Sequence, residues 1–184
     1  MIRWSNEIDE ITRQYQSSFG HLNAEKLSWK PDQQTWSIAE NIQHVIQLNA
    51  SYFPLINSMK AGTWKKPLAA RIPVAAGLMK SLILLFIQPD RRRKMKTFQI
   101  WEPSTIERPE IILDRFESHQ EELKRMIDES QILFDEGAVI ASPASRFIVY
   151  KLEDAFDIMV THEKRHLNQA RELLPLLPAD SSRP

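Results

Sequence analysis

Apolar side chains recur at spacings of three and four residues along most of the chain, which is the pattern of amphipathic helices. The first such stripe predicts a helix over residues 3–19, and Gly20 is suited to end it. Its apolar positions are Trp4, Ile8, Ile11, Tyr15 and Phe19.

The second predicted helix has a recognisable start signal. Ser37 is followed three residues later by Glu40, which is the capping-box spacing, where each side chain caps the other residue's backbone N–H. The apolar stripe continues to Ile56, so we expect a helix over residues 37–58. Pro54 is expected to kink its last turn.

Two more stripes predict the remaining long helices. A third helix should begin near Pro109, because proline suits the first helical position, and a last helix should cover residues 149–174. No strand-like alternation persists for long, so residues 21–36 and 131–147 are expected to be connectors. The sequence therefore predicts an all-α fold, an antiparallel four-helix bundle.

Residues 60–109 form a long, proline-punctuated excursion between the second and third predicted helices. A short helix is expected near residues 74–87, in an apolar stretch too short to span a bilayer comfortably. Arg91–Lys94 follows it, and a basic run of this kind fits either a membrane surface or, as we prefer, a solvated turn. Long excursions are often functional lids, although some are only ordered packing.

Size and composition narrow the classes of function. The 184 residues suit one domain, expected over residues 1–177, with a frayed tail at 178–184. The formal net charge is zero, which gives no reason to expect nucleic-acid binding. Cysteine is absent, which excludes disulfides, thiolate metal sites and a cysteine nucleophile. Without a signal-peptide pattern at the N-terminus, we expect a cytoplasmic protein.

Two histidines of the last predicted helix carry the candidate chemistry. His162 and His166 are four residues apart, so both imidazoles lie on one side of the helix, one turn apart, and can share a metal ion. A pair at this spacing is also common as two ordinary surface or core histidines. On a helical wheel, however, His166 falls near the centre of the apolar stripe and His162 at its edge.

Glu163 also falls inside this apolar stripe, and a buried carboxylate needs a partner or a raised pKa. It is a candidate acid–base catalyst, a metal ligand or a hydrogen-bond acceptor behind a ligand. The alternative is a carboxylate at the rim of the helix, paired with an arginine. Asp154 and Asp157 fall on the far side of the wheel and are expected to be solvated.

His44, at the edge of the second helix's stripe, is a candidate third ligand. Three histidines from two helices would leave a metal position open for water or substrate, as catalytic sites do. Imidazole does not select among zinc, nickel, iron and copper. His119 is expected in the core and His21 in solvent, neither as a ligand.

Two segments of the chain resemble the signatures of the DinB superfamily. Trp36–Glu40 followed by His44 resembles its second-helix signature, and the run from His162 to Ala170 resembles its last-helix signature. Ser142-Pro143 and the run into the last helix are also similar. The resemblance extends from about residue 3 to residue 176.

The resemblance implies a DinB/YfiT-like bundle with a divalent metal, nickel or zinc, on His44, His162 and His166. Characterised relatives include thiol-dependent S-transferases that use bacillithiol and a mycothiol-dependent isomerase, others are described as metal-dependent hydrolases, and homodimers are common. We therefore expect a metal-dependent enzyme acting on a small molecule, by thiol transfer or hydrolysis. The alternative is a non-catalytic metal- or ligand-binding module related to stress.

Overall fold

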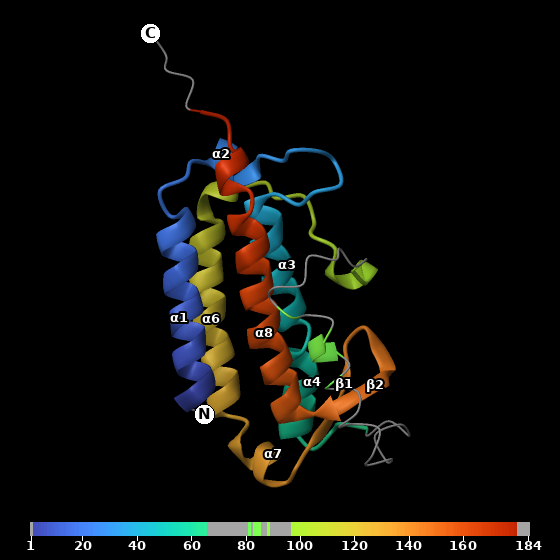
Figure 1. Cartoon of the computed structure of the whole chain (residues 1–184). Helices are drawn as coiled ribbons and strands as arrows, with labels where there is room; N and C mark the ends of the chain where they lie inside the picture. Colours follow the sequence, from blue (N-terminus) through green and yellow to red (C-terminus); the bar gives the residue numbers. More distant parts are fainter. Residues whose placement is uncertain (1, 66–80, 82, 86–87, 89–96, 180–184) are drawn as a thin grey trace.

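The computed structural model describes residues 2–65, 81, 83–85, 88 and 97–179. Helices dominate this part of the chain, so the predicted all-α class is confirmed, with one small hairpin as an addition (Figure 1). The α-helices are α1 (Ile2–Phe19), α2 (Ala24–Ser28), α3 (Ile38–Ala50), α4 (Phe53–Lys60), α6 (Ile112–Asp128), α7 (Gln131–Asp135) and α8 (Leu152–Arg171). The strands are β1 (Val139–Ser142) and β2 (Ser145–Lys151), and short 3-10 turns cover Gln99–Trp101, Pro109–Ile111 and Leu174–Leu176.

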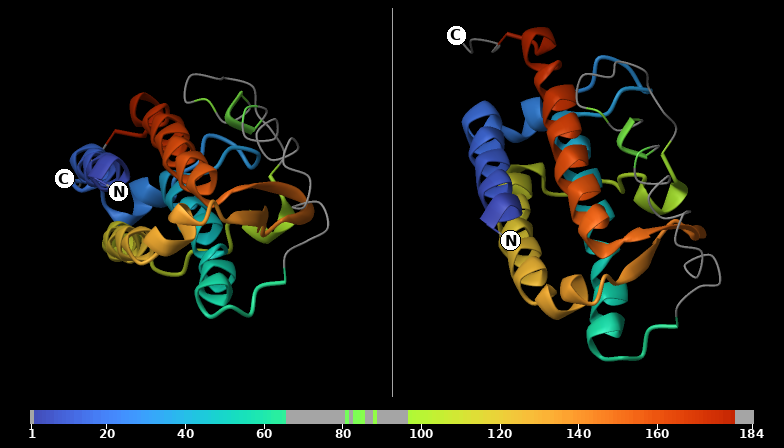
Figure 2. Two further views of the ribbon diagram at one scale, coloured as in Figure 1. Left: turned by 90° about the horizontal axis from the view of Figure 1, so that it is seen from below. Right: turned by 60° about the horizontal axis from the view of Figure 1, so that its bottom comes forward.

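The long helices α1, α3, α6 and α8 enclose the core. Helix α1 packs against α6 and α8, and α3 packs against the same two helices from the other side (Figure 2). Their apolar stripes meet in the middle and bury large side chains almost completely, which is the main driving force for this packing. Members of this core include Ile8, Tyr15, Phe19, Ile42, Phe116 and Phe156.

The first helix matches its prediction closely. Helix α1 ends at Phe19, and the next residue is Gly20. A Cβ atom at Gly20 would lie 2.6 Å from the backbone oxygen of Gln16, closer than real Cβ atoms come to any neighbour. Glycine is therefore required at this end of the helix. The connector that follows contains the short helix α2, which we did not predict and which Asn23 caps.

The predicted second helix is divided into α3 and α4. Ser37 and Glu40 form the expected capping box at the start of α3. The break falls at Ser51 and Tyr52, so the expectation of one helix kinked at Pro54 is wrong. Pro54 instead lies in the first turn of α4, where its missing N–H costs no hydrogen bond.

The segment before the last helix is the largest correction. Residues 131–147 are not a plain connector, because they form α7, β1 and most of the hairpin with β2. The strands pair in antiparallel register, with Ile140 opposite Tyr150. Helix α8 consequently begins at Leu152, later than the predicted start at 149. The third predicted helix is confirmed, since a 3-10 turn at Pro109 leads into α6.

Several expectations fall on parts of the chain that the structure does not describe. Of the predicted helix 74–87, only residues 81 and 83–85 are described, and these are helical. Arg91–Lys94 and most of the tail after residue 178 lie outside the described residues. No helix in the described ranges combines the length and the apolar character that a membrane crossing requires.

Candidate metal centre

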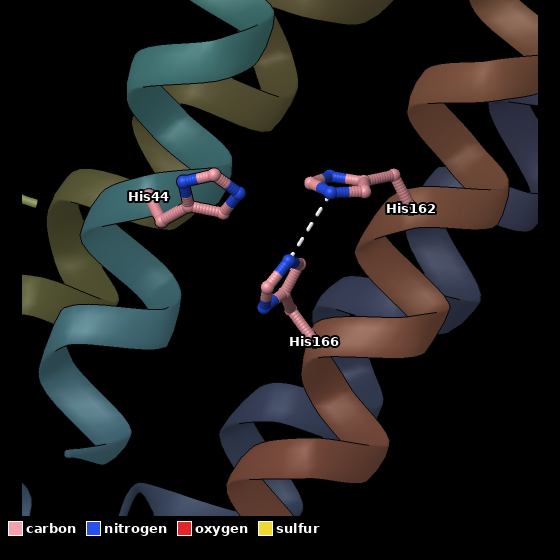
Figure 3. A group of neighbouring side chains, drawn as sticks. All are labelled: His44, His162 and His166. Carbon is pink, nitrogen blue, oxygen red and sulfur yellow. Dashed lines mark hydrogen bonds between the residues drawn. The ribbon is translucent and has the colours of Figure 1, made fainter. Parts of the chain in front are cut away.

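The three predicted ligands lie together between α3 and α8. Each of His44, His162 and His166 offers one ring nitrogen, and these three atoms lie within 4.8 Å of one another. Figure 3 shows His44 projecting from α3 toward the pair on α8, with the rings facing one another across the gap. Within the described residues, this group contains no carboxylate.

Hydrogen bonds fix which nitrogen of two of these rings is free to bind a metal. Nδ1 of His44 lies 2.6 Å from the backbone oxygen of Trp101, and Nδ1 of His166 lies 2.8 Å from Oδ1 of Asn41. Since both partners accept, both Nδ1 atoms carry the proton, and each Nε2 keeps its lone pair. His44 and His166 are therefore held in the tautomer that a metal ion needs.

The spacing on α8 also suits one ion. The Nε2 atoms of His162 and His166 lie 3.2 Å apart (dashed line in Figure 3). Two nitrogens bound tetrahedrally at about 2.05 Å from zinc would be separated by about 3.3 Å. Nδ1 of His162 is buried and has no hydrogen-bond partner in the described part of the chain.

Burial keeps the three rings neutral. It lowers the pKa of His44 to about 4, while the bond to the Trp101 carbonyl acts in the opposite direction. Burial also lowers the pKa of His162 and of His166 well below the usual value, and repulsion from neighbouring positive charge adds to this. Neutral imidazole is the form that coordinates metals, so these donors fit a divalent ion without prior deprotonation at neutral pH.

A cavity of about 1490 Å³ opens beside the three histidines. Aromatic side chains stand near the ligands: the ring of Trp36 lies 4.7 Å from that of His44 and 5.9 Å from that of His166, centroid to centroid. Arg165 is buried in the cavity wall and donates a hydrogen bond to the backbone oxygen of Gln88. The ligand set thus faces a space large enough for a small organic molecule.

Glu163 occupies a different environment from its neighbour His162. Its carboxylate is fully buried and accepts hydrogen bonds from Nδ2 of Asn49 at 2.6 Å and from Nε2 of Gln120 at 2.9 Å. Burial raises its pKa to about 7, against the opposing effect of these two amide donors. The alternative of a carboxylate at the helix rim, paired with an arginine, is wrong, because the partners are amides inside the core.

Of the remaining expectations for polar residues, those for the two aspartates are wrong and those for the two histidines are confirmed. Asp157 is not simply solvated, because it accepts a hydrogen bond from Nε1 of Trp4, and Asp154 is buried. The expectation for Asp157 was wrong because α1, which carries Trp4, packs against α8. His21 is exposed. His119 is in the core as expected, where burial lowers its pKa to about 4 and its ring stacks on Phe53.

Two groups that accept hydrogen bonds from the ligand rings were not identified from the sequence. Asn41 lies three residues before His44 on the same helix, and this i,i+3 spacing of polar groups is a signal that could have identified it. Its amide is oriented by a 2.9 Å hydrogen bond from Nδ2 to the backbone oxygen of Ser37. The other group is the carbonyl of Trp101, which has no side-chain signature.

Asn41→Ala is expected to weaken zinc binding about 10- to 100-fold, because His166 loses the acceptor that fixes its tautomer and ring orientation. Asn41→Asp keeps an acceptor oxygen at the same position and should retain most of the affinity. Competition with a chromogenic zinc chelator measures both variants. Equal affinity of Asn41→Ala and the unmodified protein would contradict the role of Asn41.

Comparison with known proteins agrees with this geometry. A family model described as the DinB superfamily matches residues 7–170, which is nearly the whole chain. No curated protein and no solved structure matches the chain. The matched range contains α3 and α8 with all three histidines, and the chain belongs to the DinB superfamily.

Proposed function

We propose that this protein binds one divalent metal ion, zinc or nickel, through His44, His162 and His166 and uses it to act on a small molecule. One observation carries the proposal: three neutral imidazoles converge beside a large cavity, two of them with the tautomer fixed by a hydrogen bond. A purely structural ion has no need of such a cavity, so the cavity favours an enzyme over a metal-storing module.

The chemistry that we favour is thiol-dependent S-transfer, with hydrolysis as the alternative. A divalent ion with an open position lowers the pKa of a thiol or water molecule that reaches it. In transfer, the thiol sulfur bonds to an electrophilic carbon, the leaving group departs with its electron pair, and the thiol proton passes to solvent. Activity of characterised superfamily members supports transfer; the metal position alone would serve either reaction.

The residues of this chain would have separate tasks. Asn41 and the Trp101 carbonyl hold two ligand rings in orientation, and the Trp36 ring packs over two of the ligands, which limits the access of bulk water. We assign Glu163 a structural role, in which its buried carboxylate joins α8 to the amides of Asn49 and Gln120, and not the role of an acid–base catalyst.

We also propose that the protein acts in the cytoplasm and that it forms a homodimer.

The two reactions are separated by a pair of assays on the zinc- and nickel-loaded protein. Monochlorobimane is offered with cysteine, glutathione or bacillithiol, and p-nitrophenyl acetate is offered without thiol. We expect conjugation of at least one thiol to exceed the uncatalysed rate about 100-fold or more and to disappear after chelation. If the protein cleaves the ester without thiol and conjugates none of the thiols, the proposed reaction is hydrolysis and not S-transfer. No turnover in either assay would contradict the enzymatic proposal.

A further inference from the structure

The cavity at the histidines continues along the seam between α3 and α8. On α3, Leu48 follows His44 by four residues, which keeps it on the same side of the helix. Leu48 lines the cavity, and so does Tyr52, which lies at the break between α3 and α4. On α8, Ile158 precedes His162 by four residues and also lines it. The cavity therefore extends from the metal ligands toward the end of α3 and the start of α8.

The β1–β2 hairpin supplies the opposite wall of this extension. It contacts the beginning of α8 and lies beside α4 (Figure 1). Ser142, Ile148 and Tyr150 of the hairpin line the same cavity. We call this part of the cavity the apolar arm; it is lined by Leu48, Tyr52, Ser142, Ile148, Tyr150 and Ile158.

The apolar arm differs in character from the other end of the cavity. None of its six lining residues carries a charged side chain at neutral pH, and burial raises the pKa of both tyrosines above the usual value. Beyond the histidines, by contrast, the lining includes Lys30, Glu40 and Glu172. A molecule filling both regions would therefore have an apolar part and a polar part on either side of the metal position.

The two tyrosines of the apolar arm are hydrogen-bonded to each other. The hydroxyl oxygens of Tyr52 and Tyr150 lie 2.5 Å apart, so one hydroxyl donates a hydrogen bond to the other. This bond satisfies the donor of one hydroxyl and an acceptor of the other within the cavity wall. An apolar group can therefore lie against the two tyrosine rings without displacing this hydrogen bond.

We infer that the substrate carries an apolar substituent that lies in the apolar arm while its reacting atom is at His44, His162 and His166. This inference rests on the proposed function. Leu48 is about 6 Å from His44 along the axis of α3, at 1.5 Å per residue, and Tyr52 lies just beyond the end of this helix. The substituent is accordingly a short alkyl chain or a single aromatic ring.

The test measures the binding of straight-chain alkyl hydroxamates, from acetohydroxamate to octanohydroxamate, to the zinc-loaded protein by calorimetry. The hydroxamate group binds zinc, so only the chain varies along the series. We expect affinity to rise about fourfold per added methylene until the apolar arm is full, as burial of each CH₂ predicts. A flat series would overturn the inference.

Two neighbouring residues of β2 provide a matched pair of variants. Ile148 lines the apolar arm, whereas Phe147 is exposed and does not, because successive strand residues point to opposite sides. Ile148→Trp should remove the chain-length dependence while leaving acetohydroxamate and zinc affinity within about twofold. Phe147→Trp should leave the whole series unchanged, and loss of the dependence in both variants, or in neither, would overturn the inference.

The same experiment separates this inference from the proposal on which it rests. If the protein fails to bind zinc, or if zinc-loaded protein fails to bind acetohydroxamate, the proposed open metal site is wrong and the inference falls with it. If zinc and acetohydroxamate both bind but longer chains bind no better, only the apolar arm is wrong.

Discussion

Replacing His166 by alanine is expected to abolish stoichiometric metal binding. His166 is the central member of the cluster: its Nε2 lies 3.2 Å from that of His162, its ring centroid lies 4.5 Å from that of His44, and Asn41 orients it. Without it, two imidazoles remain, and we expect zinc affinity to fall at least about 100-fold, more than the loss of an orienting group causes. Metal content after dialysis of protein purified without a histidine tag measures the effect.

The matched control for this experiment is His21→Ala. His21 is exposed in the connector after α1, so its loss tests whether any histidine contributes to metal content. We expect the His21→Ala protein to retain one ion per chain and both variants to keep their helix content by circular dichroism. Unchanged metal content in His166→Ala would contradict the metal centre itself.

Glu163→Ala is expected to cause a large loss of stability. It deletes the acceptor for two buried amide donors, Asn49 and Gln120, and leaves a cavity in the core. We expect the free energy of unfolding to fall by about 2–4 kcal/mol, from unsatisfied donors and lost packing together. Urea denaturation of the metal-free protein measures this loss.

Glu163→Gln is the companion variant, because it preserves shape while removing the carboxylate. Oδ1 of Asn49 and Oε1 of Gln120 have no hydrogen-bond partner among the described residues, and either can accept from a glutamine amide after the side-chain amides rotate. We expect most of the stability, zinc affinity and turnover to be retained. Lost turnover with unchanged stability and zinc affinity would instead assign Glu163 to proton transfer, and wild-type stability of Glu163→Ala would contradict its role as an anchor.

Local patterns predicted the helices that bury one continuous face. The stripe from Trp4 to Phe19 became α1, and the Ser37–Glu40 capping box starts α3 as expected, because each signal lies within a few turns of chain. The hairpin was missed since β1 has only four residues, too few for alternation to be detected, and its strands are stabilised by pairing and by packing on α8.

In the candidate site, the residues that could be predicted from the sequence are those on the faces of helices. The four-residue step from His162 to His166 follows from helix geometry, whereas the approach of His44 depends on how α3 packs against α8. The position of His44 at the edge of its helix's apolar stripe made it a candidate third ligand, and the resemblance to the DinB superfamily supported this candidate. The Trp101 carbonyl could not be predicted, because every residue has a carbonyl and only the tertiary structure determines which one meets His44.

The origin of the ligands on two helices distant in sequence has a thermodynamic consequence. An ion shared by residues 44, 162 and 166 would act as a reversible cross-link across all the chain between α3 and α8. Because binding would favour the folded state over the unfolded chain by RT ln(1 + [metal]/Kd), resistance to heat would rise with the free metal concentration. The lifetime of the folded protein would then depend on the concentration of free metal around it.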